Sequence, residues 1–386
     1  MPKLAEQLHC TGCTACASVC PKGCIAMVAD HEGFRYPQVD PALCVQCGAC
    51  ERACPVLHTL VPDHTPRAYA VISRDEEVRR ASSSGGVFTE IAKTVLQRGG
   101  VVFGAAYNDQ FDVVHICTES EADLAKLRGA KYAQSDLNGT FIQVKSRLSD
   151  GQPVLFSGTP CQVAGLHAFL GAAPDHLFTV DFICHAIPSP AVWRAYVTHR
   201  AAQDNHGQLP CAIDLRCKDS GWSRYRYSNR FTYPDGHSHQ VPSGESLYMK
   251  LFVGDHINRH SCGSCPFKGS ARASDVTLGD FWGIWDIVPE LDDDKGTSLV
   301  LVQSCKGRDL FDALSSQLIV KPVTLTQASA QNPSLLRVSS ASPLRSQIMS
   351  LALAGDFSAC ARLIAPSAPS AAQRIKHRLS EILRRR

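Results

Sequence analysis

Cys10-Thr-Gly-Cys13-Thr-Ala-Cys16-Ala-Ser-Val-Cys20-Pro21 is one of two cysteine runs with the same spacing, and Cys44-Val-Gln-Cys47-Gly-Ala-Cys50-Glu-Arg-Ala-Cys54-Pro55 is the other. Each run reads C-x2-C-x2-C-x3-C-P. Three closely spaced thiolates can bind three iron corners of one 4Fe-4S cluster, and the fourth cysteine, before the proline, then ligates the other cluster. The spacing therefore predicts two clusters.

The repeated spacing assigns the eight cysteines to two sets. The first group is Cys10, Cys13, Cys16 and Cys54, and the second group is Cys44, Cys47, Cys50 and Cys20. C-x2-C is also zinc-ligand spacing, so paired zinc sites are the alternative, which two complete four-cysteine runs disfavour. Cys24 breaks the symmetry as a bystander or an alternative ligand. We expect a short hairpin around residues 33–37.

Length and composition limit the other function classes. The chain has 386 residues, which suggests two or three domains, and its net charge of +3 is too small to indicate nucleic-acid binding. No apolar stretch is long enough to span a membrane, and the first ten residues do not resemble a secretory signal. Eighteen cysteines in this context favour metal or redox chemistry in a reducing, cytoplasmic setting.

The middle of the chain alternates expected strands and helices, which predicts an α/β core. Strands are expected at 69–72, 101–107, 111–117, 153–156 and 177–184, and helices from 87 onward and at 190–202. Ser82-Ser-Ser-Gly-Gly86 precedes the first of these helices. Such a loop admits a phosphate or a ring system close to the backbone, or it is only a helix cap with a tight turn.

Four further cysteines suggest a third site. Cys161 and Cys184 follow two predicted parallel strands, and Cys262 and Cys265 form a C-x2-C pair in a loop. Together this third group has enough thiolates for a third 4Fe-4S cluster. The alternative is two buried structural thiols with a small zinc knuckle.

Several motifs carry a family resemblance. They are Ser83-Ser-Gly-Gly-Val-Phe88, Arg128-Gly-Ala-Lys-Tyr132, Ser157-Gly-Thr-Pro-Cys-Gln162, Asp181-Phe-Ile-Cys-His-Ala-Ile-Pro188, Cys262-Gly-Ser-Cys-Pro-Phe-Lys268 and Leu278-Gly-Asp-Phe-Trp282. From about residue 66 to 283 the chain resembles the family of coenzyme F₄₂₀ hydrogenase/dehydrogenase beta subunits, with the two-cluster module in front. The expected fold is an α/β (α+β) flavin-binding core with an N-terminal bacterial-type dicluster ferredoxin domain.

The resemblance also implies site residues. FAD would be held by Ser84, Gly85, Gly86 and Lys131, and by a loop of Ser157, Gly158, Thr159 and Gln162. Cys161, Cys184, Cys262 and Cys265 match the family's third-cluster ligands. The family includes archaeal F₄₂₀-reducing subunits and a plant enzyme that reduces hydroxymethyl chlorophyll. The residues of the 157–161 and 279–283 motifs are similar to those of its bacterial branch.

Two residues are candidates for catalysis. Positive charge on Lys131 would stabilise a reduced, anionic flavin. His185 is either a proton donor or a structural histidine.

The basic and aromatic segment 216–239 suits an anionic ring-bearing substrate or a lid, and the alternative is an ordinary hairpin.

These expectations give a domain plan and a function. The plan is a ferredoxin domain at 1–60, a flavin domain in two parts at 66–150 and 151–330, and a helical, basic extension at 331–386. We expect an iron–sulfur flavoprotein oxidoreductase that moves electrons between a hydride carrier (F₄₂₀ or a nicotinamide) or small organic substrate and a partner ferredoxin or redox subunit. The alternative is a non-catalytic electron carrier that docks a separate reductase.

Residues 371–386 would form a helix that docks an acidic partner or an anionic membrane surface, or a helix that packs on the chain itself.

Overall fold

A computed structural model describes residues 1–59, 62–172, 174–223 and 226–365 of the chain. The helix expected at 371–386 lies outside the described residues. Among the described helices, none combines the length and the apolar character needed to cross a bilayer.

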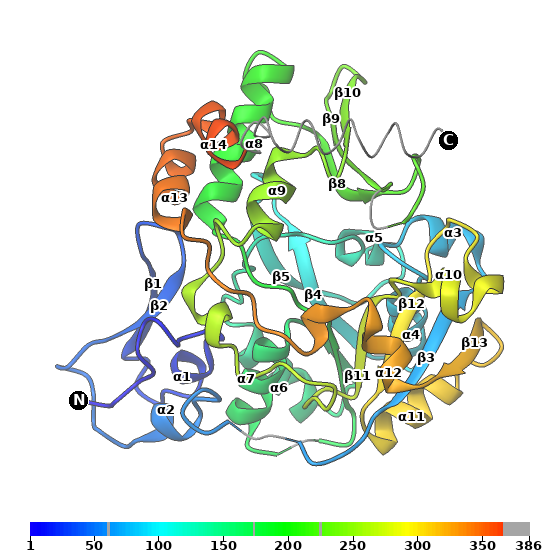
Figure 1. Ribbon diagram of the computed structural model, residues 1–386. Helices are drawn as coiled ribbons and strands as arrows, with labels where there is room; N and C mark the ends of the chain where they lie inside the picture. Colours follow the sequence, from blue (N-terminus) through cyan, green and yellow to red (C-terminus); the bar gives the residue numbers. More distant parts are fainter. Residues whose placement is uncertain (60–61, 173, 224–225, 366–386) are drawn as a thin grey trace, which may run out of the picture.

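An eight-stranded mixed sheet forms the centre of the molecule (Figure 1). Its order is β13-β3-β12-β11-β7-β6-β4-β5. The strands are β3 (Arg67–Ser73), β4 (Val101–Tyr107), β5 (Val113–Thr118), β6 (Val154–Ser157), β7 (Leu177–Phe182), β11 (Val276–Asp280), β12 (Ser298–Val302) and β13 (Leu318–Val323). The five strands expected between residues 69 and 184 are confirmed, with ends shifted by a few residues.

The middle of this sheet is parallel. β4 pairs with β6, β6 with β7, and β7 with β11, all in the same direction. β5 closes one edge, and β12, β3 and β13 extend the other, in antiparallel pairs. Because the carboxyl ends of parallel strands meet at one edge, the loops after β6, β7 and β11 lie together there.

Helices cover both faces, and the strand residues alternate to match. Val102 packs beneath α4 and α11, whereas its neighbours Val101 and Phe103 pack against α6 and α7. The helices around the sheet are α3 (Glu76–Arg80), α4 (Val87–Gln97), α5 (Leu124–Leu127), α6 (Thr140–Ser149), α7 (Pro160–Leu170), α10 (Ile284–Ile287), α11 (Cys305–Asp312) and α12 (Leu325–Ala330). The period of two places consecutive apolar side chains on opposite faces of the sheet.

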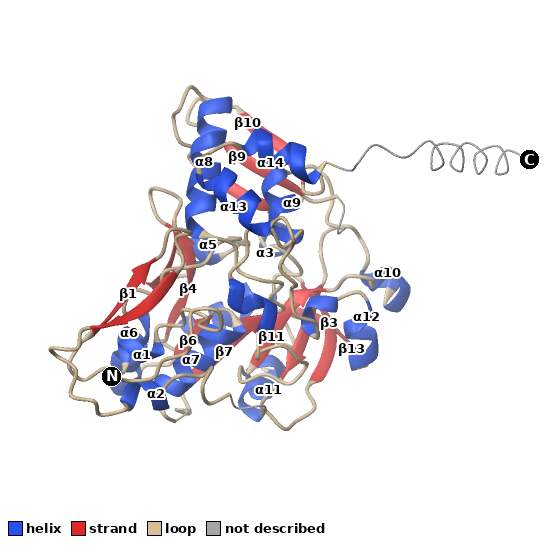
Figure 2. Ribbon diagram, turned by 60° about the vertical axis from the view of Figure 1, so that its left-hand side comes forward, coloured by secondary structure: helices blue, strands red, loops and turns tan. Residues whose placement is uncertain are grey.

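A helical lobe with a smaller sheet lies beyond the main sheet, at the top of Figures 1 and 2. It comprises α8 (Pro190–Asp204), α9 (Leu247–Val253), α13 (Arg345–Leu353), α14 (Phe357–Ile364), β8 (Ala212–Cys217), β9 (Ser228–Thr232) and β10 (Ser238–Pro242), with strand order β10-β9-β8. Its core is aromatic and includes Trp193, Tyr196, Phe231 and Tyr248. β9 and β10 form an antiparallel hairpin, which was the alternative interpretation of segment 216–239.

The N-terminal module is small and inserts into the body. Two single-turn helices, α1 (Ala15–Ser18) and α2 (Ala49–Arg52), accompany the antiparallel hairpin of β1 (Ile25–Ala29) and β2 (Arg35–Val39). The turn follows from Asp30, whose carboxylate accepts hydrogen bonds from the amides of Glu32 and Phe34, and from Gly33 at φ +83°. Phe34 is fully buried in the core of the helical lobe, so the hairpin tip is part of that core.

Candidate electron-transfer centre

Both cysteine runs contain two residues with left-handed backbone angles at matching positions. In the first run Gly12 and Thr14 take left-handed backbone angles, and Gln46 and Gly48 do so at the matching positions of the second run. Left-handed angles are unfavourable for a residue with a side chain, by roughly 1–2 kcal/mol, and persist only where the surroundings enforce them. Each run can therefore wrap its first three cysteines around one point.

The structure brings the first group together. Burial raises the pKa of Cys16 to about 12, and the neighbouring Cys10 and Cys54 contribute to this rise. Burial likewise raises the pKa of Cys13, with added contributions from Cys16, Cys10 and Cys161. The last of these neighbours belongs to the body of the protein, so the first group lies beside the third.

A glycine of α7 makes room for Cys13. A Cβ atom at Gly165 would lie 2.9 Å from both the Cβ and the Sγ of Cys13. This is closer than side-chain atoms pack, so α7 approaches the cysteine only because position 165 has no side chain.

The second group lies at the outer side of the module. Cys20, Cys44, Cys47 and Cys50 line one hollow with about 340 Å³ of empty space, together with Cys24. The Sγ atoms of Cys20 and Cys24 are 3.3 Å apart, so Cys24 is a neighbour of the second group and not a distant bystander. Cys47 is exposed, and so are the adjacent Leu43 and Val45.

The third group also converges, as expected from the strand order. Cys161 lies in the first turn of α7, directly after β6, and Cys184 follows β7, the strand paired with β6. The C-x2-C pair lies in and just after the 3₁₀ turn His260–Ser264. All four cysteines line a second hollow with about 460 Å³ of empty space.

The third hollow combines buried thiols with cations. Burial raises the pKa of Cys161 to about 12 and that of Cys184 well above its usual range, which leaves bare thiols neutral. Arg259 acts against the rise at Cys161 and Lys268 against the rise at Cys184. Both cations line the hollow, so it is suited to a group that carries negative charge.

Within the described ranges, no three His, Cys, Asp or Glu side chains gather closely enough to hold one metal ion. A cubane requires a wider arrangement, because each thiolate binds a different iron.

A polar site lies next to the third group, on the same strand-end edge. The imidazole Nε2 of His115 is 3.0 Å from the carbonyl oxygen of Ser157, and Lys131 Nζ lies 5.9 Å from the ring centre of Tyr107. Tyr107 Oη and His115 Nδ1 are buried and lack hydrogen-bond partners among the described residues. Buried polar atoms without partners are costly, so the site is incomplete without a ligand or water.

Charge in this polar site is low. Burial lowers the pKa of Lys131 from 10.5 to about 7, while Asp214 acts in the opposite direction. Burial also lowers the pKa of His115 to about 4, so its imidazole is neutral at pH 7. Lys131 donates to the backbone carbonyls of Arg128 and Gly129, which fixes its amino group at the edge of the site.

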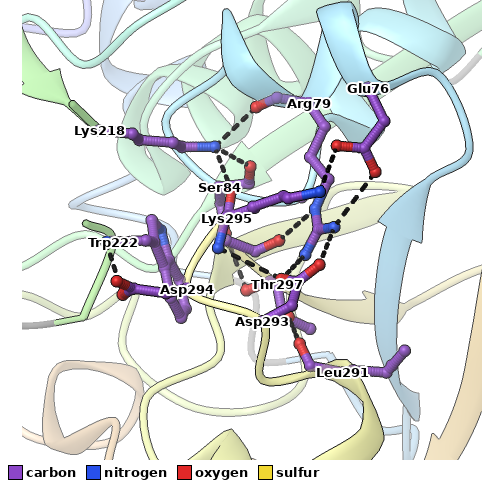
Figure 3. Close-up of polar contacts among 12 residues, drawn as sticks. Glu76, Arg79, Ser84, Lys218, Trp222, Leu291, Asp293, Asp294, Lys295 and Thr297 are labelled. Atoms are coloured by element: carbon purple, nitrogen blue, oxygen red, sulfur yellow. Dashed lines mark hydrogen bonds and ion pairs between the residues drawn. The ribbon is translucent and has the colours of Figure 1, made fainter. Parts of the chain in front are cut away.

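The Ser84–Gly86 loop is held from two sides, and Figure 3 shows one of them, the contact of Lys218 with Ser84. A Cβ atom at Gly85 would meet the backbone oxygen of Val71 at 2.3 Å, so the loop is packed directly on β3. On the other side, Lys218 donates to the carbonyls of Arg79, Ser84 and Lys295 at 2.6–2.8 Å. The loop therefore has a packing role of its own.

Arg216 in β8 and Trp222 after it are both buried. Trp222 stacks on Trp282 with ring centres 5.0 Å apart, and its indole donates to the carbonyl of Ser83. The buried Arg216 pairs with Asp280 at 2.8 Å. Both side chains donate to the carbonyl of Ser83, which directly precedes the Ser84–Gly86 loop.

Thr159 and Gln162 form a reciprocal cap on α7. Gln162 Oε1 accepts from the amide of Thr159 at 2.9 Å, and Thr159 Oγ1 accepts from the amide of Gln162. The cap fixes the first turn of α7 and with it Cys161. Gln162 Nε2 donates to Ser135, which ties this loop to the Lys131 loop.

His185 has a partner at each ring nitrogen. Its Nε2 lies 2.9 Å from Asp255 and its Nδ1 3.3 Å from Ser334. With both nitrogens engaged, the imidazole links the loop after β7 to the helical lobe, although it also lines the third hollow.

Comparisons with known proteins agree with this arrangement. Residues 68–141 match the family model for the N-terminal part of the coenzyme F₄₂₀ hydrogenase/dehydrogenase beta subunit, and residues 151–326 match the model for its C-terminal part. Residues 9–57 match the 4Fe-4S dicluster domain. The chain belongs to the family of coenzyme F₄₂₀ hydrogenase/dehydrogenase beta subunits. Its N-terminal module is a dicluster ferredoxin domain that holds 4Fe-4S clusters.

Individual relatives cover parts of this family member. One component of the F₄₂₀H₂ dehydrogenase of Methanosarcina mazei is 24% identical over 173 residues, which are 42% of this chain and 49% of the relative. A 7Fe ferredoxin of Hydrogenibacillus schlegelii is 39% identical over 64 residues, 16% of this chain and 76% of the ferredoxin. The chain thus spans about half of the length of the dehydrogenase component.

A structural comparison adds one chain of the F₄₂₀-reducing [NiFe] hydrogenase complex from Methanosarcina barkeri, at 16% identity and a TM-score of 0.46, covering 77% of this family member and 92% of that chain.

Three residues of this centre were missed by the sequence-based expectations. His115 and Tyr107 lie in strands that were interpreted only as core, and Arg259 precedes the C-x2-C pair without a motif of its own. Only a histidine at a predicted strand position, His115, gave a usable signal, because histidine is uncommon in fully buried strands.

Proposed function

We propose that this family member is a flavin- and iron–sulfur-dependent oxidoreductase that moves electrons between a two-electron donor and a one-electron partner. The observation that carries the proposal is contiguity. The first group lies beside Cys161 of the third group, and the loop that bears Cys161 also bears Ser157, which contacts His115 in the polar site. Three candidate redox sites therefore adjoin one another along one edge of the sheet.

We assign the third group as ligands of a third 4Fe-4S cluster. Cys161, Cys184, Cys262 and Cys265 line one hollow, and the cations Arg259 and Lys268 beside them would balance a negatively charged cluster.

The polar site is our candidate for the FAD ring. Tyr107 and His115 each offer a buried, unpartnered polar atom there, and Lys131 offers an amino group whose pKa burial lowers to about 7. A flavin supplies conversion between two-electron and one-electron transfer. In this assignment Lys131 stabilises negative charge on the ring, and Ser157 and Gly158 line it, while the Ser84–Gly86 loop lies further along the same edge.

One observation favours the alternative of an electron carrier without flavin. Gly85, Thr159 and Gln162 all have packing or capping roles that require no ligand. The two functions differ in flavin content, so one measurement separates them.

The test is anaerobic reconstitution followed by cofactor analysis. Twelve cysteines at four per cluster give three clusters, so we expect about twelve iron atoms and about one FAD per chain. Cys262→Ala should lower the iron content by about four and leave the ferredoxin-domain signals intact. An iron content near eight in the unaltered chain would remove the third cluster, and clusters without FAD would establish the carrier.

A further inference from the structure

Arg259 lies at the junction between the ferredoxin module and the body. Its Nε donates to the carbonyl of Cys10 at 2.8 Å and its Nη2 to the carbonyl of Arg35 at 3.0 Å, both in the module. Its Nη1 donates to Gln134 Oε1 of the body at 2.8 Å. One guanidinium group therefore connects two parts of the chain that are more than 200 residues apart in sequence.

The surroundings of Arg259 keep its charge out of water. Its exposed fraction is 2%, and its guanidinium lies 4.2 Å from the ring centre of Tyr36 and 5.3 Å from that of Phe34. Gly12 lies beside it at φ +70°, and a Cβ atom there would lie 3.1 Å from Nη1, which is a tight contact. No carboxylate forms an ion pair with Arg259 among the residues that the structure describes.

The same side chain lines the hollow of the third group, and so does Thr11 of the module. Thr11 is tied to the body through its carbonyl, which accepts from Gln134 Nε2 at 3.0 Å. Arg259 thus borders the third group on one side and holds the backbone of Cys10, a member of the first group, on the other.

We propose that Arg259 is a positioning residue that holds the first group against the third and supplies the positive charge that raises the reduction potentials at this junction. The proposal rests on the third cluster assigned above. Reduction adds one negative charge to a cluster, and a buried cation nearby stabilises that charge, because cluster potentials depend on net charge and on the hydrogen bonds around them. One cluster is oxidised by one electron as the other is reduced, and no bond or proton changes place.

Arginine suits this position better than lysine. Its planar fork can donate to three acceptors at once, whereas an ammonium on a flexible stem offers the charge without that geometry. Arg259→Lys should therefore keep the reduction potential close to that of the unaltered chain but loosen the junction between the module and the body. Arg259→Met should both lower the potential and loosen the junction.

The experiment measures potential and docking separately in the full, reconstituted chain. Cluster potentials come from redox titrations followed by electron paramagnetic resonance, and docking comes from hydrogen exchange of the 25–39 hairpin. In Arg259→Met we expect the third-group potential to fall by about 59 mV. For a one-electron couple this is about a tenfold change in the ratio of reduced to oxidised cluster. A unit charge roughly 10 Å away in an effective dielectric constant of about 20 gives an effect of this order.

Two control variants separate the effect on potential from the effect on docking. Lys268→Met removes a cation that lines the same hollow but donates only to body carbonyls, such as those of His185 and Ser334, so it should shift the potential without loosening the hairpin. Arg52→Met removes an exposed cation beside the second group, where it donates to the Cys47 carbonyl, and should leave the third-group potential unchanged.

Unchanged potentials in Arg259→Met would overturn the proposal even if hairpin exchange rises, because a purely structural arginine would give that result. If Arg259→Met fails to fold, Arg259→Gln gives the same comparison with a polar, neutral side chain. Iron analysis of the unaltered chain comes first, since a count near eight would refute the third cluster and not the docking role, which hydrogen exchange still tests.

Discussion

At the scale of single residues, the absence of a side chain at Gly165 decides how closely the ferredoxin module approaches the body. Glycine in a helix interior costs roughly 0.5–1 kcal/mol relative to alanine, so α7 is less stable for having it. The position is nevertheless occupied by glycine where Cys13 packs 2.9 Å from the missing Cβ. Packing of the first group therefore outweighs helix propensity here.

Gly165→Ala is expected to destabilise the chain despite the better helix former. Overpacking costs about 1–3 kcal/mol, more than the propensity gain, and a cysteine held by a cluster cannot move away. The unfolding temperature and the iron content should both fall. Gly104→Ala is the matched control, because its Cβ would meet Leu127 only at 3.4 Å or more, an ordinary contact. Equal stability of the two variants would contradict this account.

Lys131 gives a second residue-scale prediction, based on pH. Its pKa is lowered from 10.5 in a free side chain to about 7 by burial. Between these values the unfolded chain binds the proton that the folded chain has lost, so the cost of burying Lys131 is largest near pH 7 and below and disappears above about pH 10.5. Lys131→Met should therefore raise the unfolding temperature near pH 7 and have less effect near pH 10.

The measurement is calorimetry of both variants at the two pH values, without added flavin. Lys126→Met serves as the control, because Lys126 is exposed and pairs with Asp123 on the surface. A stabilisation by Lys131→Met that grows with pH would refute the lowered pKa of Lys131.

The cysteines illustrate how far sequence could reach at this scale. The membership of all three groups followed from spacing and strand ends, because metal ligands must be close and chain geometry limits which ones can be. Arg259 and His115 could not be found in this way, since their roles depend on contacts between segments far apart in the chain. Thr159 and Gln162 were expected in a loop that holds flavin; Thr159 is the N-cap of α7, and Gln162 lies in the first turn of that helix, where its side chain completes the cap.

At the scale of elements, the β1–β2 hairpin is what makes the ferredoxin module an integral part of the molecule. Its tip carries Glu32, which forms a buried, two-pronged ion pair with Arg345 of α13. Gly33 lies against α8, where a Cβ atom would be 2.7 Å from the amide nitrogen of Ala191. The sequence predicted a short hairpin around residues 33–37, and the structure has a longer one over residues 25–39. The partner 313 residues away could not be predicted.

Breaking this ion pair on one side should be costly. Glu32→Gln leaves the charge of Arg345 buried without its partner, and such losses are typically about 3–5 kcal/mol. The double variant Glu32→Gln with Arg345→Met should cost less than the sum of the two single changes. A double-mutant cycle by anaerobic urea unfolding measures the coupling, and strictly additive costs would show that the pair does not act as a unit.

Segment 216–239 shows why element-scale prediction was incomplete. Its density of basic and aromatic residues suggested a substrate surface or lid, with an ordinary hairpin as the alternative. The structure instead places Arg216 and Trp222 in contact with the Ser83 carbonyl and Trp282. A pattern of polar and aromatic residues does not by itself distinguish a binding surface from a buried polar layer, because both need the same side chains.

At the scale of the whole molecule, the three cysteine groups form a series. The second group lies outermost, with Cys47 exposed, and the first group lies between it and the third. Cys16 is close to members of both ferredoxin groups, since its pKa responds to Cys54 and to Cys50. An electron that leaves the body for a partner at the exposed surface would therefore pass the first group on its way.

This order predicts different effects for two ligand variants. Cys54→Ser alters the first group in the middle of the series, and Cys47→Ser alters the second group at its end. If the proposed flavin is bound and photoreduced, with cytochrome c as the acceptor, both variants should slow acceptor reduction. Only Cys54→Ser should also slow the appearance of the second-group signal in freeze-quenched electron paramagnetic resonance spectra. Cys47→Ser should leave reduction of the first group at its normal rate, because that group precedes the altered site. If Cys54→Ser left second-group reduction as fast as in the unaltered chain, electrons would reach the outer group by another route and the proposed series would be wrong.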